Sequence, residues 1–345
     1  MDRTVLRALV ACAWLSCQPA LAAAPAAAPP AAPGEDRAAA YQALIEAAAA
    51  TVNVKVKALA NARSNATLGR ERLGSGTYIA PQNLVLTIGY LIIEAESVEV
   101  TTTSGRTVPA IVQAYDAATG FGLLRPLAPL DVKPIALGAS ARVEALDKLL
   151  VAAGAGDETV SIATVVSRRP FAGYWEYFLD NAIFTTPPRP DFGGAALINR
   201  EGLLVGVGSL FVMDAAEPGE RMPGNMFVPI DLLKPILDDM IAKGRNPGGV
   251  RPWLGVNSME QDGRLHVIRV SSDSPAERAG IEPGDIILQL EGAPVRRLED
   301  FYKRLWASGA PGVEVKLRVL KGTDVQDFTI RTIDRAENMR KRPSI

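Results

Sequence analysis

Histidine and cysteine, the residues that most often build catalytic and metal sites, are almost absent from this chain. The single histidine, His266, lies in a segment whose pattern predicts a β-strand, and residues 51–230 contain none. The only cysteines are Cys12 and Cys17, close to the N-terminus. A Ser-His-Asp or Cys-His triad needs an imidazole beside the nucleophile, and zinc sites are built mainly from histidine and cysteine. We therefore expect no such triad within residues 51–230, no metal site and no cofactor.

A Ser-Lys dyad is the remaining scheme for activating a serine. Ser161, Ser167, Ser209 and Lys148 lie in the same region, but their spacing singles out no pair. A lysine that acts as a base also needs a pKa strongly lowered by burial. We therefore favour no dyad.

Charge and composition describe an ordinary globular chain. Its 345 residues are 48% hydrophobic, and 37 lysines and arginines nearly balance 38 aspartates and glutamates. Such a length predicts two or three domains. A balanced charge provides no field that would attract nucleic acid or an anionic membrane, so we expect neither as a partner.

The N-terminus has the pattern of a secretory signal peptide. Basic residues precede an apolar run, and Ala20-Leu21-Ala22 provides the small residues that signal peptidase recognises. We expect a signal peptide over residues 1–22. The run is shorter than the ~20 residues that span a bilayer, and a lipoprotein reading that uses Cys17 is a weaker alternative. Residues 23–34, almost all alanine and proline, predict an extended linker.

The predicted secondary structure, which must position any site, changes along the chain. Residues 35–50 predict a short helix, and residues 51–230 consist of short β-branched runs broken by turn residues, which is typical of an all-β barrel or sandwich. Residues 231–243 have helical spacing, with Asp231 as a suitable N-cap. A linker over residues 246–249 then leads to a second compact unit.

The second unit resembles the PDZ domains of bacterial HtrA proteases. Three segments carry the resemblance: 251–256 (Arg-Pro-Trp-Leu-Gly-Val), 274–281 (Ser-Pro-Ala-Glu-Arg-Ala-Gly-Ile) and 283–287 (Pro-Gly-Asp-Ile-Ile). The resemblance implies that Trp253, Leu254, Gly255 and Val256 form the loop and strand that bind a peptide carboxylate and an extended chain. Residues 298–307 would form the other wall of the groove. A PDZ fold that serves only for packing is the alternative.

The β-rich unit resembles the trypsin-like domain of the same family. The segments that carry this resemblance are 74–76 (Gly-Ser-Gly), 86–90 (Leu-Thr-Ile-Gly-Tyr), 116–124 (beginning Asp-Ala-Ala-Thr-Gly) and 190–194 (Pro-Asp-Phe-Gly-Gly). Aligned with the family's motifs, they place Tyr90 at the general base, Gly120 at the residue that orients the base, and Phe192 at the nucleophile.

None of these replacements can do the chemistry of the residue it replaces. Phenylalanine has no nucleophilic atom, glycine has no side chain, and a phenol with a pKa near ~10 is a poor base at neutral pH. Pro190 replaces a glycine whose N–H stabilises the oxyanion, and proline has no N–H. Asp191 is then expected to have a structural role.

An aromatic cluster lies where the family has loops near its cleft. Its members are Phe171, Tyr174, Trp175, Tyr177 and Phe178. Packing within the core or between domains is the interpretation we favour, and a binding surface is the alternative.

The resemblance therefore predicts a mainly β protein: a trypsin-like double β-barrel (residues 35–245), a PDZ domain (246–335) of the α+β type, and a basic tail (336–345). We expect a secreted, periplasmic pseudoprotease that acts as an adaptor, regulator or chaperone and binds peptide C-termini or extended segments. An active endopeptidase with non-standard residues and a structural subunit of an envelope complex are the alternatives. The family also implies a homotrimer or a mixed oligomer.

Overall fold

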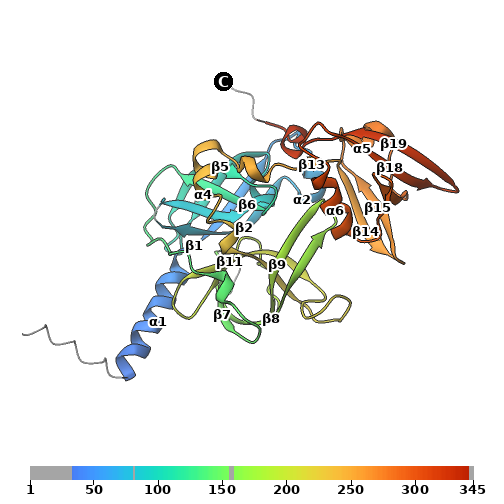
Figure 1. The fold of residues 1–345 in the computed structure, drawn as a ribbon. Helices are drawn as coiled ribbons and strands as arrows, with labels where there is room; N and C mark the ends of the chain where they lie inside the picture. Colours follow the sequence, from blue (N-terminus) through green and yellow to red (C-terminus); the bar gives the residue numbers. More distant parts are fainter. Residues whose placement is uncertain (1–32, 81, 155–158, 342–345) are drawn as a thin grey trace, which may run out of the picture.

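The computed structural model describes residues 33–80, 82–154 and 159–341. The predicted signal peptide and all but the last two residues of the predicted linker lie outside these ranges. Helix α1 (Pro33–Ala49) begins two residues before the predicted start. It contacts β1, β7 and β10, and its N-terminal part projects away from the body of the molecule (Figure 1).

The first β-barrel is closed, with the strand order β1-β2-β3-β6-β5-β4. Its strands are β1 (Thr51–Ala58), β2 (Glu71–Ile79), β3 (Leu84–Ile88), β4 (Ala95–Thr101), β5 (Thr107–Tyr115) and β6 (Phe121–Pro126). In β1, Val52, Val54 and Val56 all point inward and are fully buried, as the period of two requires. A side chain at Gly76 would overlap Val85, so the close approach of β2 and β3 requires glycine there.

The second barrel is also closed, with the order β10-β11-β12-β9-β8-β7. Its strands are β7 (Lys148–Ala152), β8 (Val160–Gly173), β9 (Tyr177–Thr186), β10 (Ala196–Ile198), β11 (Leu204–Val212) and β12 (Gly224–Pro229). Strands β8 and β9 form one long hairpin, paired as far as Gly173 and Tyr177. Two closed barrels confirm the double-barrel prediction.

The helix expected over residues 231–243 is much shorter than predicted. A 3-10 turn η2 (Ile230–Leu232) comes first, and the α-helix α4 covers only Leu237–Lys243. Pro235 lies between them, and it cannot donate a helical hydrogen bond and disfavours helical backbone at the residue before it. Asp231 does not cap α4. Its carboxylate accepts the N–H of Ala141 at 2.7 Å instead.

Four other short helical segments lie in and after the barrels. They are α2 (Asn65–Leu68), α3 (Gly89–Ile92), η1 (Ser140–Arg142) and η3 (Pro247–Gly249). Segment η3 lies in the predicted linker, where the side chain of Asn246 accepts the N–H of Gly248 at 3.0 Å.

The C-terminal unit is a sheet with two helices. Its strands are β14 (Val256–Gln261), β15 (Arg264–Val270), β16 (Ile286–Leu290), β17 (Ala293–Pro294), β18 (Glu314–Lys321) and β19 (Asp324–Arg331), in the order β14-β15-β16-β18-β19 with β17 beside β16. Strand β14 is therefore an edge strand. A separate ladder joins β13 (Pro252–Trp253) to β20 (Ile333–Asp334). The helices are α5 (Pro275–Ala279), α6 (Leu298–Ala307) and the 3-10 turn η4 (Arg335–Asn338), so the helix predicted over 298–307 has its predicted bounds.

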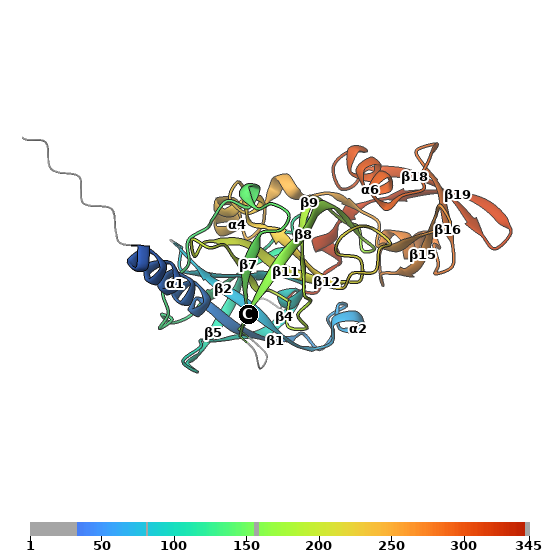
Figure 2. The same ribbon diagram turned by 90° about the horizontal axis from the view of Figure 1, so that it is seen from below.

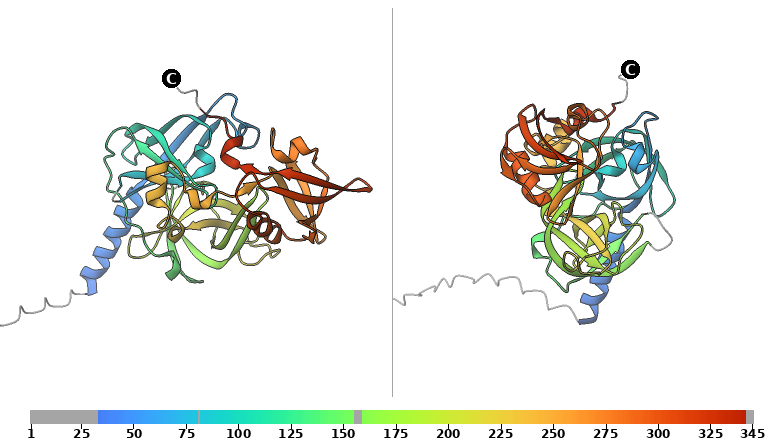
Figure 3. Two further views of the ribbon diagram at one scale, coloured as in Figure 1. Left: turned by 45° about the horizontal axis from the view of Figure 1, so that its top comes forward. Right: turned by 90° about the vertical axis from the view of Figure 1, so that its right-hand side faces the viewer.

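The C-terminal unit lies beside the barrels, at the end of the molecule opposite α1 (Figure 2). The β8–β9 hairpin reaches from the second barrel to α6 and β14 (Figures 1 and 3). Phe178 of β9 is buried in the hydrophobic core of the C-terminal unit rather than in that of the barrel. The start of the predicted tail is also packed, since Asn338 is buried and its amide donates to the carbonyl groups of Ser272 and Asp273.

Candidate functional site

Tyr90, Gly120 and Phe192 line one cavity of about 420 Å³. Tyr90 comes from α3, Gly120 from the turn before β6, and Phe192 from the loop before β10. The structure thus brings together three positions that lie far apart in the sequence. The cavity is also lined by Trp175 of the hairpin and Trp253 of the C-terminal unit, so it lies where the barrels meet that unit.

Tyr90 makes a structural hydrogen bond across the cavity wall. Its hydroxyl donates to the carbonyl of Ser209 at 3.0 Å. Burial raises the pKa of Tyr90 well above its ordinary value, because an apolar surrounding disfavours the phenolate. The neutral phenol therefore acts as a donor and is no base at physiological pH.

Gly120 belongs to a tight turn that Asp116 stabilises. The Asp116 carboxylate accepts the N–H and the hydroxyl of Thr119 at 2.8 and 2.7 Å. Gly120 has φ +83°, in the left-handed region that favours glycine. The hydroxyl of Tyr177 donates to the Thr119 carbonyl at 2.6 Å. Gly120 itself has no side chain, and the nearby Asp116 carboxylate is bonded to Thr119.

The loop around Phe192 is held by an ion pair. Asp191 accepts two hydrogen bonds from Arg189, at 2.9 and 2.6 Å, a geometry that suits the planar guanidinium. Pro190 is exposed and has no N–H to offer. The carbonyl of Phe192 accepts the N–H of Ala195 at 3.0 Å. Asp191 therefore has a structural partner, as the sequence suggested.

The serines considered for a dyad have partners other than lysine. Ser167 donates to the carbonyl of Ala215 at 2.6 Å, and the hydroxyl of Ser161 accepts from Arg189 at 2.7 Å. Lys148 is exposed at the start of β7. Within the part of the chain that the structure describes, none of the serines considered, Ser209 included, hydrogen-bonds to Lys148.

The loop at residues 254–256 does bind a carboxylate, and that carboxylate belongs to the same chain. The N–H groups of Leu254, Gly255 and Val256 donate to the side chain of Glu176 at 3.1, 2.6 and 3.0 Å. Gly255 has φ +90°, and a side chain there would overlap Ser274. Its conformation turns successive N–H groups toward one point, as in other anion-binding loops.

Trp253, the first residue of the predicted loop, has a different position. It pairs with Ile333 in the β13–β20 ladder and lines the cavity. Of the four residues predicted to form the loop, three donate to the carboxylate and Trp253 packs beside it.

Glu176, at the tip of the β8–β9 hairpin, was not singled out by the sequence. It is only 6% exposed, and burial raises its pKa to about 7, although the three N–H groups and the charge of Arg335 act in the opposite direction. An isolated acidic residue in an aromatic segment carries no motif. Only the contact with a loop 78 residues further along the chain reveals its role.

The hairpin also pairs with the groove of the C-terminal unit. The N–H of Ser258 in β14 donates to the carbonyl of Tyr174 at 2.9 Å. On the other side, the hydroxyl of Tyr302 in α6 donates to the carbonyl of Gly173 at 2.7 Å and accepts the N–H of Glu176 at 3.2 Å. Within the aromatic cluster, Tyr177 is buried in the barrel core and Phe178 in the core of the C-terminal unit, as the favoured interpretation predicted, whereas Tyr174 is 49% exposed and lines the cavity.

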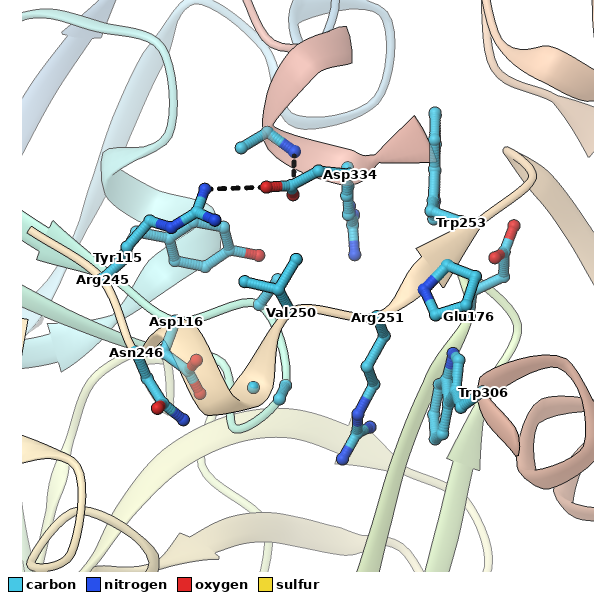
Figure 4. A pocket seen from close by; sticks show the side chains of 16 residues that line it. Tyr115, Asp116, Glu176, Arg245, Asn246, Val250, Arg251, Trp253, Trp306 and Asp334 are labelled. Carbon is cyan, nitrogen blue, oxygen red and sulfur yellow. Dashed lines mark hydrogen bonds and ion pairs between the residues drawn. The ribbon is translucent and has the colours of Figure 1, made fainter. Parts of the chain in front are cut away.

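A smaller pocket, of about 70 Å³, lies next to this contact (Figure 4). Arg245 pairs with Asp334 at 2.7 Å across it, and the guanidinium of Arg251 lies 3.9 Å from the ring centre of Trp306. Figure 4 places Glu176 beside Trp253 at its edge. The first contact joins the residue before the linker to the C-terminal unit, and the second lies within that unit.

The described residues also bear on metal binding and on membrane crossing. Among the described residues, no group of three or more histidine, cysteine, aspartate or glutamate side chains is placed to hold a metal ion. No helix within residues 33–341, as far as they are described, is long and apolar enough to cross a membrane.

Comparison with known proteins identifies both units. Residues 74–207 match the trypsin-like peptidase domain family, and residues 252–332 match the PDZ domain family. A putative serine protease HhoA from Synechocystis is 28% identical over 289 residues, covering 75% of this chain and 70% of its own. The serine endoprotease DegS of Escherichia coli is 27% identical over 268 residues, covering 73% and 74%.

A probable periplasmic serine endoprotease, DegP-like, from Halomonas elongata is 24% identical, and the match spans 77% of this chain but 57% of that relative. Among solved structures, an HtrA-type protease AlgW with decapeptide (19% identical, TM-score 0.51) covers 88% of this chain and 99% of its own. A serine endoprotease from Yersinia pestis (24%, TM-score 0.50) covers 86% and 97%. These structures share the fold.

The chain belongs to the HtrA-type family of trypsin-like proteases with a C-terminal PDZ domain. The predicted fold class, a mainly β double barrel followed by a PDZ domain, is confirmed.

Proposed function

We propose that this chain is a non-catalytic HtrA relative that binds the C-termini or extended segments of envelope proteins through its PDZ groove, as an adaptor, regulator or chaperone. The single observation that carries the binding role is the geometry of the loop: the N–H groups of Leu254, Gly255 and Val256 converge on a carboxylate. A chain end presents the same chemical group.

The absence of catalysis is argued from the chemistry of the cavity. Acyl transfer from a peptide needs a nucleophile, a base within hydrogen-bonding reach and donors for the oxyanion. Tyr90 is a neutral phenol bonded to a carbonyl, Phe192 has no nucleophile, and Pro190 removes one oxyanion donor. Losing one such donor alone slows related enzymes by about 10²- to 10³-fold.

Secretion and assembly extend the proposal to the cell. We infer that a signal peptide over residues 1–22 directs the chain to the periplasm, a location that the name of the Halomonas elongata relative also gives. The family favours a homotrimer or a mixed oligomer with an active relative. Size determination by light scattering, alone and with such a relative, tests this assembly.

An activity assay tests the missing catalysis. The mature chain (residues 23–345) is incubated with casein and, separately, with a fluorescent fluorophosphonate that labels activated serines. We expect neither cleavage nor labelling above a heat-denatured sample, whereas an active HtrA protease processed in parallel gives both. Labelling of a serine would favour the active endopeptidase with non-standard residues.

A binding assay tests the other half of the proposal. Peptides with a free C-terminus are titrated into the full mature chain, and saturable binding that is lost on C-terminal amidation is expected. Its absence at every tested sequence would favour a structural subunit.

A further inference from the structure

The carboxylate in the PDZ loop comes from the chain itself, which raises the question of what the hairpin does there. Glu176 occupies the three N–H donors that a chain end needs. A second carboxylate cannot use the same N–H groups, so Glu176 and a chain end exclude each other.

The hairpin tip lies along the edge of β14, where a peptide strand would add. The N–H of Ser258 donates to the backbone carbonyl of Tyr174, and the N–H of Val256 donates to the side-chain carboxylate of Glu176. From Tyr174 to Glu176 the hairpin advances by two residues, while their partners go back from Ser258 to Val256. This opposite order is that of antiparallel strands. A peptide that adds to the edge of β14 with its carboxylate in the loop would have this direction and spacing.

The second wall of the groove holds the same segment. Tyr302 of α6 bonds to both Gly173 and Glu176. The hairpin therefore contacts all three parts of the groove: the loop, the edge strand and the helix.

We propose that the hairpin tip, Gly173–Glu176, is an internal ligand of the PDZ groove, which accepts an external chain end only when this tip is displaced. The inference rests on the proposed peptide binding and adds its regulation. The affinity for an external chain end is then its intrinsic affinity multiplied by the fraction of molecules with an undocked tip. Weakening the internal contact should tighten external binding without changing the groove.

Glu176→Gly is the most direct variant. Glu176 has φ +57°, a backbone conformation that glycine adopts without strain, so the hairpin turn is preserved while the carboxylate is removed. Glu291→Gly is the matched control, because Glu291 has φ +52° in a PDZ turn outside the groove. Glu176→Gln keeps the side-chain shape but replaces one of the two acceptor oxygens with an NH2 group, which cannot accept the N–H of Leu254.

The probe is a fluorescent peptide of residues 169–176 with free carboxylates, since the groove already holds part of this sequence. Its partner peptide ends as an amide and has glutamine in place of glutamate. Titrated into the full mature chain at pH 8, the first peptide should bind the Glu176→Gly variant at least tenfold more tightly than the wild type or Glu291→Gly. Glu176→Gln should lie between, and the carboxylate-free peptide should bind all of them weakly.

Hydrogen exchange of the amides at residues 254–258, without peptide, separates this inference from the proposed function. Slow exchange in the wild type and Glu291→Gly, and faster exchange in Glu176→Gly, would support the internal ligand even if no peptide bound and the binding function failed. Equal exchange in all three proteins, or equally tight peptide binding by the wild type and Glu176→Gly, would overturn it.

Discussion

At the scale of single residues, the large cavity and the PDZ loop present different chemical groups. The large cavity presents a phenol at Tyr90, a glycine at Gly120 and a phenyl ring at Phe192. The polar chemistry lies instead at Glu176, a buried acid held by three N–H groups. Its desolvation exceeds the effect of these hydrogen bonds, because its pKa is raised to about 7 from an ordinary value of 4.5.

This raised pKa predicts a pH dependence of hairpin docking. A carboxyl group whose pKa is higher in the docked state binds its proton more tightly there, so the added stability is complete below about pH 4.5 and is lost as the pH rises through 7. The charge of Arg335 lowers the pKa of Glu176 in part, and burial raises the pKa of the neighbouring Tyr302 phenol, which is neutral in this range. The exchange protection of the Gly255 amide, corrected for intrinsic exchange, should be about tenfold lower at pH 8 than at pH 6.

The Glu176→Gln variant is the control for this pH dependence, since an amide does not titrate. It should show the same protection at both pH values. A wild-type protection that increased from pH 6 to pH 8 would contradict the assignment of a raised pKa.

At the scale of elements, the β8–β9 hairpin connects the large cavity to the PDZ loop. Trp175 stacks on Tyr177, with ring centres 5.5 Å apart, and both line the large cavity. Glu176 lies in the PDZ loop. The same hairpin thus lines the large cavity and occupies the PDZ groove. A movement of its tip would therefore change both.

Tyr302→Phe should loosen this hairpin without changing the packing of α6. The hydroxyl satisfies the carbonyl of Gly173 and the N–H of Glu176, and removing it leaves two buried backbone groups without that partner. We expect a loss of about 1–3 kcal/mol, measured as a lower urea midpoint. Tyr41→Phe on α1, whose tyrosine is 68% exposed, should leave the midpoint unchanged.

At the scale of the whole molecule, polar and apolar contacts join the two units unequally. Arg63 of the first barrel bonds to Asp273 and to the carbonyl of Asn338, and the N–H of Arg340 donates to Glu94 at 2.7 Å. Exposed ion pairs contribute about 0–1 kcal/mol each. The insertion of Phe178 into the PDZ core removes a large apolar surface from water and therefore contributes more than any one of these ion pairs.

Phe178→Ala should separate the two units. The ring is 6% exposed within the PDZ core, and removing it should cost about 3–5 kcal/mol. We expect calorimetry to change from one unfolding transition to two, with the PDZ unit melting first. Phe211→Ala, at a side chain that is 45% exposed, is the control, and a single transition in both variants would contradict this division of the energy.

Much of the fold could be predicted from local sequence. The alternating valines of β1 depend only on neighbours along the chain, whereas the helix over residues 298–307 was predicted from the resemblance to PDZ domains. Strands β10 and β12 are buried at every residue, so they lack the alternation that marks a half-buried strand. The helix near Asp231 was predicted too long because apolar spacing was given more weight than Pro235.

The sequence by itself determined what is missing: with no histidine in residues 51–230, no arrangement of the barrels can supply a catalytic imidazole. The motif around Gly255 also predicted a carboxylate-binding loop. Three of its four residues donate N–H groups to a carboxylate, because the backbone conformation of Gly255 directs these groups toward one point. Only the tertiary structure decided that this carboxylate is Glu176. A contact between residues so far apart is created by packing one unit on the other, and no local pattern encodes it.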